Sequence, residues 1–294
     1  MAERILGLWD LMYWVCFGVF VLVMLALLAA VLRRRQETDK APVAAVAAAT
    51  VVTVLVLFVL LIGSVVTGRA TATLTGDPLV LRVVGKQWWW QVDYVDPMPS
   101  RSITTANEIH IPVGVPVKIH LESSDVIHSF WVPSLHGKKD LIPGIKNVLW
   151  IQADRPGVYR GQCAEFCGAQ HSWMALLVIA EPPERFAAWA EAQRQSSVPP
   201  RTPQQARGRY LIERLPCANC HTIRGTLASG KLGPDLTHLA SRRTLAAGTM
   251  PNNRGHLGGW MLDPQSIKPG SLMPPTAMSP ESLQAVLAYL ETLK

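Results

Sequence analysis

Two long apolar runs near the N-terminus constrain the fold of this chain more than any other feature. Residues 11–32 and 43–67 contain no Asp, Glu, Lys, Arg or His, and each reaches the roughly 20 residues that a membrane-spanning helix needs. We therefore predict two transmembrane helices within an N-terminal segment 1–68. The same runs help to make 49% of the 294 residues hydrophobic, which excludes a disordered chain and argues against an ordinary soluble enzyme.

The flanks of these runs predict an orientation in the membrane. The first run could also be a signal peptide, because Arg4 precedes it, but it is too long for a signal-peptide core and no clear small-x-small cleavage site follows. We expect a retained helix. The short loop 33–40 is basic, which predicts a cytoplasmic loop. Everything from Gly68 onward is then expected on the periplasmic side of a bacterial inner membrane.

From about residue 79 the apolar pattern changes to short runs separated by Pro, Gly and Asp turns. Runs rich in Val, Ile and Leu fit β-strands at 79–84, 108–113, 115–121, 147–152 and 175–179. Many short strands joined by such turns predict an all-β Greek-key sandwich. We assign this domain to residues 69–180, followed by a linker with a short helix at 181–202.

Residue types that bind metals cluster inside this β-domain. Cys163 and Cys167 are separated by three residues, and two imidazoles and one thioether accompany them. Soft donors that include a thioether favour copper over zinc, and two thiolates can bridge two copper ions, each with its own histidine. A plain disulfide would leave the other donors unexplained. The candidate ligands are His128, Cys163, Cys167, His171, Met174 and the backbone carbonyl of Glu165. No position is left open for a substrate, so the pattern indicates an electron carrier.

A second motif, Cys217-Ala-Asn-Cys220-His221, is the attachment pattern of a c-type haem. The two thiols would bind the vinyl groups covalently, and the adjacent histidine would be an axial ligand. A zinc site would need a second pair of ligands, and His238 and His256 lack paired spacing. A thioredoxin-like site would need a βαβ setting, which the sequence lacks. We therefore predict a haem domain at residues 203–294.

The middle of the chain resembles subunit II of haem–copper cytochrome c oxidases. The resemblance rests on residues 125–133, 140–144 and 163–174 and on Gly85-Lys-Gln-Trp-Trp-Trp90, and it covers about residues 10–180. It implies a cupredoxin fold whose six candidate ligands hold the dinuclear copper centre CuA. It also implies that electrons enter this centre at Trp88, with Trp90 packing beside it. The Glu165 side chain matches one that helps to hold a magnesium ion against subunit I, and a solvated loop carboxylate is the alternative.

The C-terminal segment resembles small class I cytochromes c. In that family the second axial ligand is a methionine in a Pro-Gly-x-x-Met-Pro loop, and Met273 lies in such a loop just before the expected final helix 280–293. Met278 is the alternative, whereas Met250 and Met261 are expected to be packing residues. The family match also implies that the Pro234 carbonyl accepts the ring N–H of His221, which would fix the tautomer.

The resemblance implies a multidomain membrane protein: a two-helix transmembrane hairpin, an all-β cupredoxin-like domain and an all-α cytochrome c domain. Its implied function is to bring electrons into a proton-pumping terminal oxidase, a cytochrome-c oxidase. Electrons would pass from a cytochrome c-type donor or an upstream complex through haem c and CuA to subunit I, where oxygen becomes water; subunit III is a further expected partner. The alternative is the CuA-bearing subunit of a nitric oxide reductase-type complex, because the catalytic site lies in another chain.

The net charge of +7 lies mostly in the haem domain, since residues 201–294 carry 11 Lys and Arg against 5 Asp and Glu. A basic patch of this kind can bind nucleic acid. Next to two redox sites, we interpret it instead as a docking surface for an acidic redox partner. We expect no nucleic-acid partner.

Overall fold

The computed structural model describes residues 2–32, 40–72 and 74–294. The basic loop on which the predicted orientation depends has its residues 33–39 outside this described part. The described residues form two compact units, 1–74 and 75–294. Each unit is considered by itself below.

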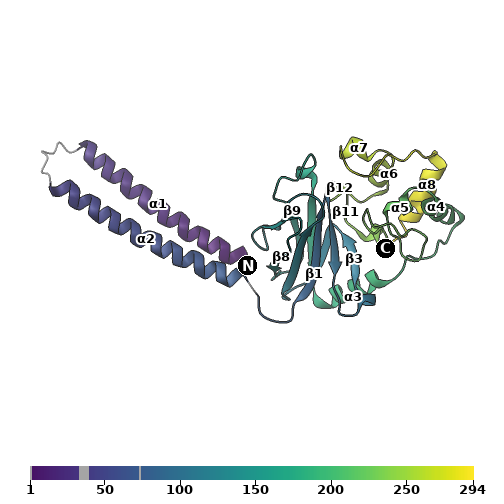
Figure 1. Cartoon of the computed structure of the whole chain (residues 1–294), viewed down its shortest axis with the longest axis horizontal. Coiled ribbons are helices and arrows are strands. Elements are labelled where there is room, and N and C mark those ends of the chain that lie inside the picture. The colour runs from purple at the N-terminus through teal and green to yellow at the C-terminus, as the bar shows by residue number, and fades with distance from the viewer. Residues whose placement is uncertain (1, 33–39, 73) are drawn as a thin grey trace. The chain divides into compact units, whose positions relative to one another are not determined.

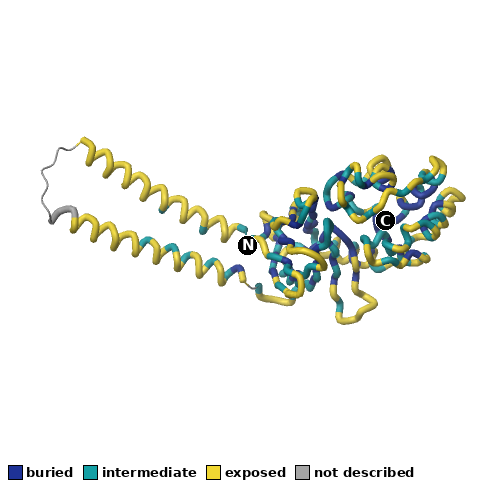
Figure 2. The backbone as a smooth tube through the Cα atoms, turned by 45° about the horizontal axis from the view of Figure 1, so that its top comes forward, coloured by how far each residue is buried: buried dark blue, intermediate teal, exposed yellow. Residues whose placement is uncertain are grey.

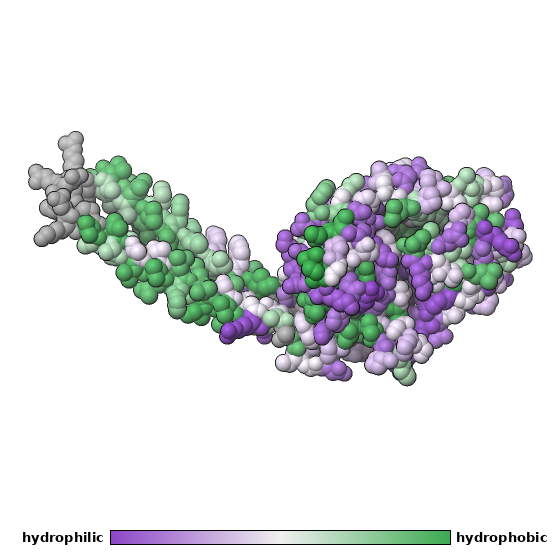
Figure 3. Space-filling model, viewed as in Figure 1, coloured by the Kyte–Doolittle hydropathy of each residue, from purple (hydrophilic) through white to green (hydrophobic). Residues whose placement is uncertain are grey.

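The N-terminal unit is a pair of long helices, α1 (Ala2–Leu32) and α2 (Lys40–Ala72). Each exceeds the apolar run predicted for it, because the helix continues through the residues that flank the run. Near the ends of the two helices, the Arg4 guanidinium donates to the Ala70 carbonyl (2.9 Å). Apolar side chains are exposed along both helices (Figures 2 and 3). Both helices are long and apolar enough to cross a membrane.

The β-domain is built from two sheets, as the short apolar runs separated by turns predicted (Figure 1). Their strands are β1 (Leu79–Lys86), β2 (Trp89–Tyr94), β3 (Ile103–Ala106), β4 (Glu108–Pro112), β5 (Val117–Ser123), β6 (His128–Trp131), β7 (Lys139–Leu141), β8 (Asn147–Ile151), β9 (Gly157–Cys163) and β10 (Ala175–Glu181). One sheet has the order β3-β2-β1-β5-β8 and the other β4-β10-β9-β6-β7. The pairs β1–β5 and β4–β10 are parallel, and the remaining pairs are antiparallel. This mixed topology is the cupredoxin-like sandwich that the resemblance implied.

Inward-facing side chains from both sheets form one hydrophobic core. On β5, Val117, Ile119 and Leu121 are fully buried while the residues between them are partly exposed, which is the period of two expected for a strand. Phe130 on β6 and Leu176 on β10 meet them from the other sheet and are also fully buried. The core therefore gives a rigid base to the loops at the ends of these strands.

A helical connector, α3 (Pro183–Arg194), follows β10 and packs on the β-domain. Its Trp189 stacks on the imidazole of His110, with ring centroids 4.2 Å apart. Phe186 and Trp189 also pack against Tyr94. The predicted short linker helix is thus held against the sheets by aromatic contacts.

The C-terminal part is mainly helical. Its elements are α4 (Pro203–Arg214), α5 (Cys217–Cys220), α6 (Arg254–Leu262), α7 (Pro264–Ile267), α8 (Pro280–Leu290) and the strands β11 (Thr244–Leu245) and β12 (Met250–Pro251). A short 3-10 turn occurs here at Leu239–Ser241, and two others occur in the β-domain at Pro99–Arg101 and His171–Trp173. A capping box between Thr202 and Gln205 begins α4. Helices α4 and α8 cross at Gly208, where a Cβ atom would lie 2.0 Å from the Ala285 carbonyl oxygen.

The hairpin β11–β12 departs from the all-α expectation for this domain. Its turn contains Ala246 and Ala247 at φ +52° and +60°, followed by Gly248 at φ +77°. Left-handed backbone is unfavourable for alanine, so the turn needs support from outside the hairpin. The amide of Ala175 supplies it by donating to the Ala247 carbonyl (3.0 Å). A two-residue strand held by a distant contact leaves no periodic pattern in the sequence.

Candidate metal and haem sites

The pairing of β6 with β9 brings the first candidate ligands together. Phe130 lies opposite Cys163 in this pair, so His128 at the start of β6 reaches the thiol at the end of β9. The distance from His128 Nδ1 to Cys163 Sγ is 3.9 Å, and the two sulfur atoms of Cys163 and Cys167 are 3.7 Å apart. The three side chains are buried, and their ligand atoms lie within 4.8 Å of one another.

The loop between Cys163 and Met174 adds the other predicted donors. Cys167 Sγ is 3.7 Å from His171 Nδ1 and 3.8 Å from Met174 Sδ. The Glu165 carbonyl oxygen lies 3.2 Å from Cys163 Sγ. The amide of Cys163 donates to the Met174 carbonyl (2.9 Å) and closes the loop at its base. All six candidate ligands therefore gather around the pair of thiols.

The two thiols have opposite shifts in acidity. The hydrogen bond between the two sulfurs is the main cause that lowers the pKa of Cys163, and the same bond with burial raises the pKa of Cys167. Two sulfurs, two imidazoles, a thioether and a carbonyl form a donor set that suits copper, so the residues fit the group that the sequence implied.

Asp125 orients the buried histidine, a role that sequence reasoning missed. Its Oδ1 atom accepts a hydrogen bond from His128 Nε2 (2.7 Å), which turns Nδ1 toward Cys163. Burial lowers the pKa of His128, but its hydrogen bonds to Cys163 and Asp125 outweigh this and raise it. The other oxygen, Oδ2, accepts from the amide of Gln87 (2.8 Å). An acidic residue three positions before a predicted metal-binding histidine was the available signal.

The turn between β1 and β2 contacts the same loop directly. The indole Nε1 of Trp88 and the amide Nε2 of Gln87 both donate to the carbonyl of Cys167, at 2.9 and 2.7 Å. Trp90 is fully buried, with its ring against His128 and Phe130 at centroid distances of 6.1 and 5.8 Å. Trp88 is therefore bonded to the loop, whereas Trp90 is a core residue behind the histidine.

Glu165 offers two different groups. Its carbonyl faces the thiols, as described above, whereas the residue itself is exposed and its carboxylate accepts from the amide of Phe166 (3.3 Å). Phe166 is also highly exposed. An exposed carboxylate is available to a partner chain, and it is equally consistent with a solvated loop residue.

The second motif occupies the short helix α5. Cys217 and Cys220 are free, partly exposed thiols, and His221 follows directly. His221 Nδ1 donates to the carbonyl of Pro234 (2.7 Å), as the family match implied, which leaves Nε2 as the atom that can bind a metal. Burial lowers the pKa of His221 and favours the neutral ring.

Close packing fixes the ring of His221 in this orientation. A Cβ atom at Gly233 would lie 2.5 Å from its Cε1 atom, so only glycine leaves room here. An oriented neutral imidazole beside two free thiols fits covalent attachment and ligation of a c-type haem.

Met273 and Met278 both pack, partly buried, against the core of the C-terminal part. The side chain of Gln265 donates to the carbonyls of Met273 (2.9 Å) and Ser271 (2.8 Å), which fixes the loop around Met273. Met250 and Met261 are buried in the same core. The choice of Met273 over Met278 as axial ligand remains a prediction.

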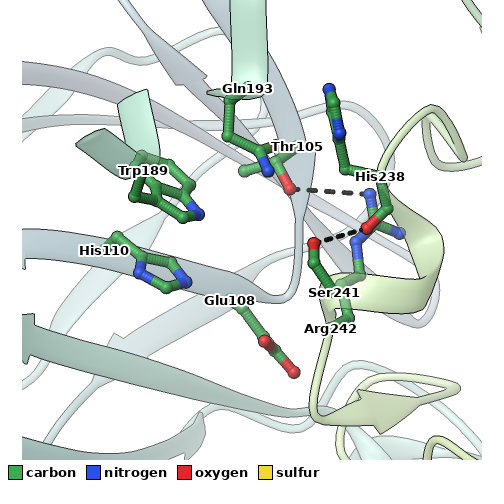
Figure 4. Close-up of a pocket in the computed structure, with 8 residues that line it drawn as sticks. All are labelled: Thr105, Glu108, His110, Trp189, Gln193, His238, Ser241 and Arg242. Carbon is green, nitrogen blue, oxygen red and sulfur yellow. Dashed lines mark hydrogen bonds between the residues drawn. The ribbon is translucent and has the colours of Figure 1, made fainter. Parts of the chain in front are cut away.

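A polar contact joins the β-domain to the C-terminal part on one side, where the Arg242 guanidinium donates to the Thr105 hydroxyl (Figure 4). Buried Glu108 accepts hydrogen bonds from the amides of Arg243 (2.8 Å) and Thr244 (2.9 Å). Burial raises the pKa of Glu108, and the hydrogen bonds from Thr244 and Arg243 oppose that rise. The adjoining cavity, about 10 Å³ in volume, is lined by His110 and Arg242 among others, and it lies away from the six copper-ligand candidates. We interpret it as part of the interface.

Comparisons with known proteins find matches for both parts of the chain. Residues 97–181 match the family "Cytochrome C oxidase subunit II, periplasmic domain", and residues 205–294 match the family "Cytochrome c". Cytochrome c oxidase subunit 2 of Alkalihalophilus pseudofirmus is 40% identical over 221 residues, and that of Bacillus sp. (strain PS3) is 32% identical over 227 residues. Each match covers 74% of this chain, which spans 63% and 62% of the length of these relatives.

The structural comparison matches the middle of the chain to the periplasmic domain of subunit II of cytochrome oxidase (CoxB) of Bradyrhizobium japonicum. The identity is 28%, the match covers 42% of this chain and 97% of that chain, and the TM-score is 0.39.

The fold and sites define a membrane-protein class with an external cupredoxin-like domain and a C-terminal cytochrome c domain. More particularly, the chain matches the cytochrome c oxidase subunit II family in its β-domain and the cytochrome c family in its C-terminal part.

Proposed function

We propose that this chain brings electrons into a proton-pumping terminal oxidase, as its subunit II. Electrons from a cytochrome c-type donor or an upstream respiratory complex would pass through haem c and dinuclear CuA to the haem–copper centre of subunit I, where oxygen is reduced to water. The observation that carries this proposal is the gathering of six copper-type donors around two buried thiols, in a chain that also has a haem-attachment motif. The overall reaction would be that of a cytochrome-c oxidase.

At the copper site, we propose that the chain's own residues hold two metal ions in a fixed cage. The ligands would be His128, Cys163, Cys167, His171, Met174 and the carbonyl of Glu165. When bound by these residues, copper would supply one-electron transfer. The residues contribute the rigid base: Cys163 is fixed at its amide, and the side chain of Asp125 orients His128. Trp88, bonded to the Cys167 carbonyl, is the proposed route by which electrons enter.

At the haem site, Cys217 and Cys220 would bind haem c covalently, with His221 and Met273 as axial ligands. The Pro234 carbonyl holds the proton on Nδ1 of His221, so the other ring nitrogen would be free to bind the haem iron. A Met273→Ala variant should lose the methionine–haem charge-transfer band, whereas Met278→Ala should keep it. The reverse result would assign the ligand to Met278.

We propose that α1 and α2 anchor the chain as a multi-pass protein in a bacterial inner membrane, with both redox domains on the periplasmic side. Subunit I and subunit III of the oxidase would be the partners in the bilayer. The exposed carboxylate of Glu165 would help to hold a magnesium ion against subunit I. The basic haem domain would face the electron donor.

The experiment that tests this function measures gas consumption by the purified complex with reduced cytochrome c. We expect oxygen consumption, with two coppers and one haem c per copy of this chain. Consumption of nitric oxide but not oxygen would favour the nitric oxide reductase-type alternative. One zinc per chain, without a near-infrared copper band, would contradict the copper assignment.

A further inference from the structure

Lys268 is a buried cation in the contact between the two proposed redox domains. It follows α7 and is only 2% exposed. Its Nζ atom donates to the carbonyl oxygens of Trp88 (2.9 Å), Trp173 (2.7 Å) and Ala246 (2.9 Å). An ammonium group has three protons, so all three are used. Burial lowers the pKa of Lys268 to about 7, and the three carbonyl dipoles counteract that loss of hydration.

Each of the three acceptors belongs to a segment next to a proposed redox site. Trp88 is the residue whose indole is bonded to the Cys167 carbonyl. Trp173 directly precedes Met174 in the copper loop. Ala246 lies in the turn of the β11–β12 hairpin. The carbonyl of the following residue, Ala247, accepts a hydrogen bond from the Ala175 amide. One side chain of the cytochrome c domain therefore joins two segments of the copper domain to a hairpin of its own domain.

The backbone after Lys268 makes further contacts with the copper domain. The side chain of Gln170, within the copper loop, donates to the Pro269 carbonyl (2.8 Å). A Cβ atom at Gly270 would lie 3.7 Å from Cη2 of Trp88, so the chain passes along the indole ring. Three residues further on is Met273, the proposed haem ligand. Residues 268–270 thus connect Trp88 with the haem loop.

We propose that Lys268, with the backbone segment 268–270 that it anchors, is the positioning residue that holds the haem domain against Trp88 in one fixed geometry for electron transfer to the copper centre. This inference rests on the proposed function. In the transfer, one electron leaves the haem and reduces the copper centre by one equivalent, with no bond made or broken. Fixed geometry favours such a step because the two centres need not first find one another.

A lysine suits this position because it satisfies carbonyls from both domains at once. In a Lys268→Met variant of similar length, the carbonyl oxygens of Trp88, Trp173 and Ala246 would lose this donor, and each lost hydrogen bond weakens the contact. Two of the three lie in the copper domain. The loss should therefore weaken domain docking more than the fold of either domain.

The test compares Lys268→Met with Lys294→Met in the intact, purified complex. Lys294 is an exposed lysine of the haem domain, so the control removes a lysine charge from the surface. The first measurement is hydrogen exchange at the amides of Ala175, Arg243 and Thr244, which donate across the interface. The second is the rate at which a photoreduced haem reduces the copper centre, at two solvent viscosities. Optical spectra and midpoint potentials check that both sites are intact.

We expect Lys268→Met to speed exchange at these three amides and to slow the transfer by about tenfold or more, as loss of positioning does. The slowed transfer should depend on viscosity, because domain motion would then limit it. Spectra and potentials should stay unchanged, and Lys294→Met should match the unmodified chain. Unchanged exchange and rate in Lys268→Met would overturn the proposal.

Two other outcomes are separable. If Lys268→Met loses the absorption bands of the copper or haem site, a second variant, Gln170→Ala, replaces it. This variant removes the hydrogen bond from the copper loop to the Pro269 carbonyl. Faster exchange at the three amides would then support the proposal, and unchanged exchange would overturn it. If the haem of the unmodified complex never reduces copper, the proposed function fails. The exchange measurement then still decides whether Lys268 docks the domains.

Discussion

The indole nitrogen of Trp88 donates a hydrogen bond to the carbonyl oxygen of Cys167 over 2.9 Å. This bond joins the turn between β1 and β2 to a loop that carries both thiols of the proposed copper site. The same tryptophan offers its own carbonyl to Lys268 of the haem domain. Trp88 therefore has one contact toward each proposed redox centre.

A Trp88→Phe variant should slow the reduction of the copper centre by the haem, because the ring remains but its bond to the copper loop is lost. Removing one such bond should lower the free energy of unfolding by roughly 0.5–1.5 kcal/mol. Flash photolysis measures the rate, and denaturant unfolding measures the stability. Trp150→Phe is the control, since Trp150 on β8 lies under the Lys118 ammonium, with Nζ 5.8 Å from the ring centroid. A normal rate in Trp88→Phe would remove this residue from the electron route.

An Asp125→Ala variant should weaken copper binding about 10–100-fold, as expected when the carboxylate that orients a metal-binding histidine is removed. His128 would lose its 2.7 Å bond, and the Gln87 amide would lose its acceptor. Competition with a copper chelator measures the affinity. Asp154→Ala removes an exposed loop carboxylate and should have no effect. Equal affinities in the two variants would contradict the orienting role.

A Glu108→Gln variant should change how stability depends on pH. The folded-state pKa of Glu108 is raised above its ordinary value of 4.5. The fold therefore binds this proton more tightly than the unfolded chain, and the associated stability is present below pH 4.5 and lost as pH rises through the folded-state pKa. Glutamine keeps an acceptor for the Arg243 and Thr244 amides but has no charge.

We expect the free energy of unfolding of Glu108→Gln, relative to the unmodified chain, to increase as pH rises above 4.5. Denaturant unfolding of the detergent-solubilised protein at several pH values measures this difference. The exposed Glu184→Gln is the control. If the difference in free energy of unfolding between the two proteins does not change with pH, or falls as pH rises, then burial does not disfavour the ionised form of Glu108.

A Gly208→Ala variant should destabilise the haem domain. The new Cβ would lie 2.0 Å from the Ala285 carbonyl oxygen, in backbone that cannot rotate away, and overpacking of this kind costs about 1–3 kcal/mol. Gly259→Ala in α6 is the matched control, because no neighbouring atom lies within 4 Å of its Cβ position. That change should stabilise its helix by roughly 0.5–1 kcal/mol. Unfolding followed by haem absorbance compares the two, and a harmless Gly208→Ala would contradict the close crossing of α4 and α8.

Local sequence by itself determined those parts of this protein that a continuous run of residues or a short motif of ligand residues marks. The apolar runs gave α1 and α2, the runs rich in Val, Ile and Leu gave β1, β4, β5, β8 and β10, and the spacing of Cys163, Cys167, His171 and Met174 predicted a loop on which their donors meet. His128 was harder to place, because its position beside Cys163 depends on the pairing of two strands that are distant in sequence. The strands β2, β3, β7 and β9 and the β11–β12 hairpin were not predicted, and some strand bounds differ, since these features are stabilised by contacts rather than marked by periodicity.

Only the tertiary structure decided which ordinary residues serve these sites. Asp125 orients His128 from a bend that no periodic pattern marks. Lys268 is 180 residues from Trp88 in sequence, and a lone lysine in a loop is normally a solvated charge. Its ammonium becomes a buried donor because folding brings three carbonyls from distant segments to one point. Hydrogen bonds act over about 3 Å, so residue spacing can announce a ligand loop but not a contact between two domains.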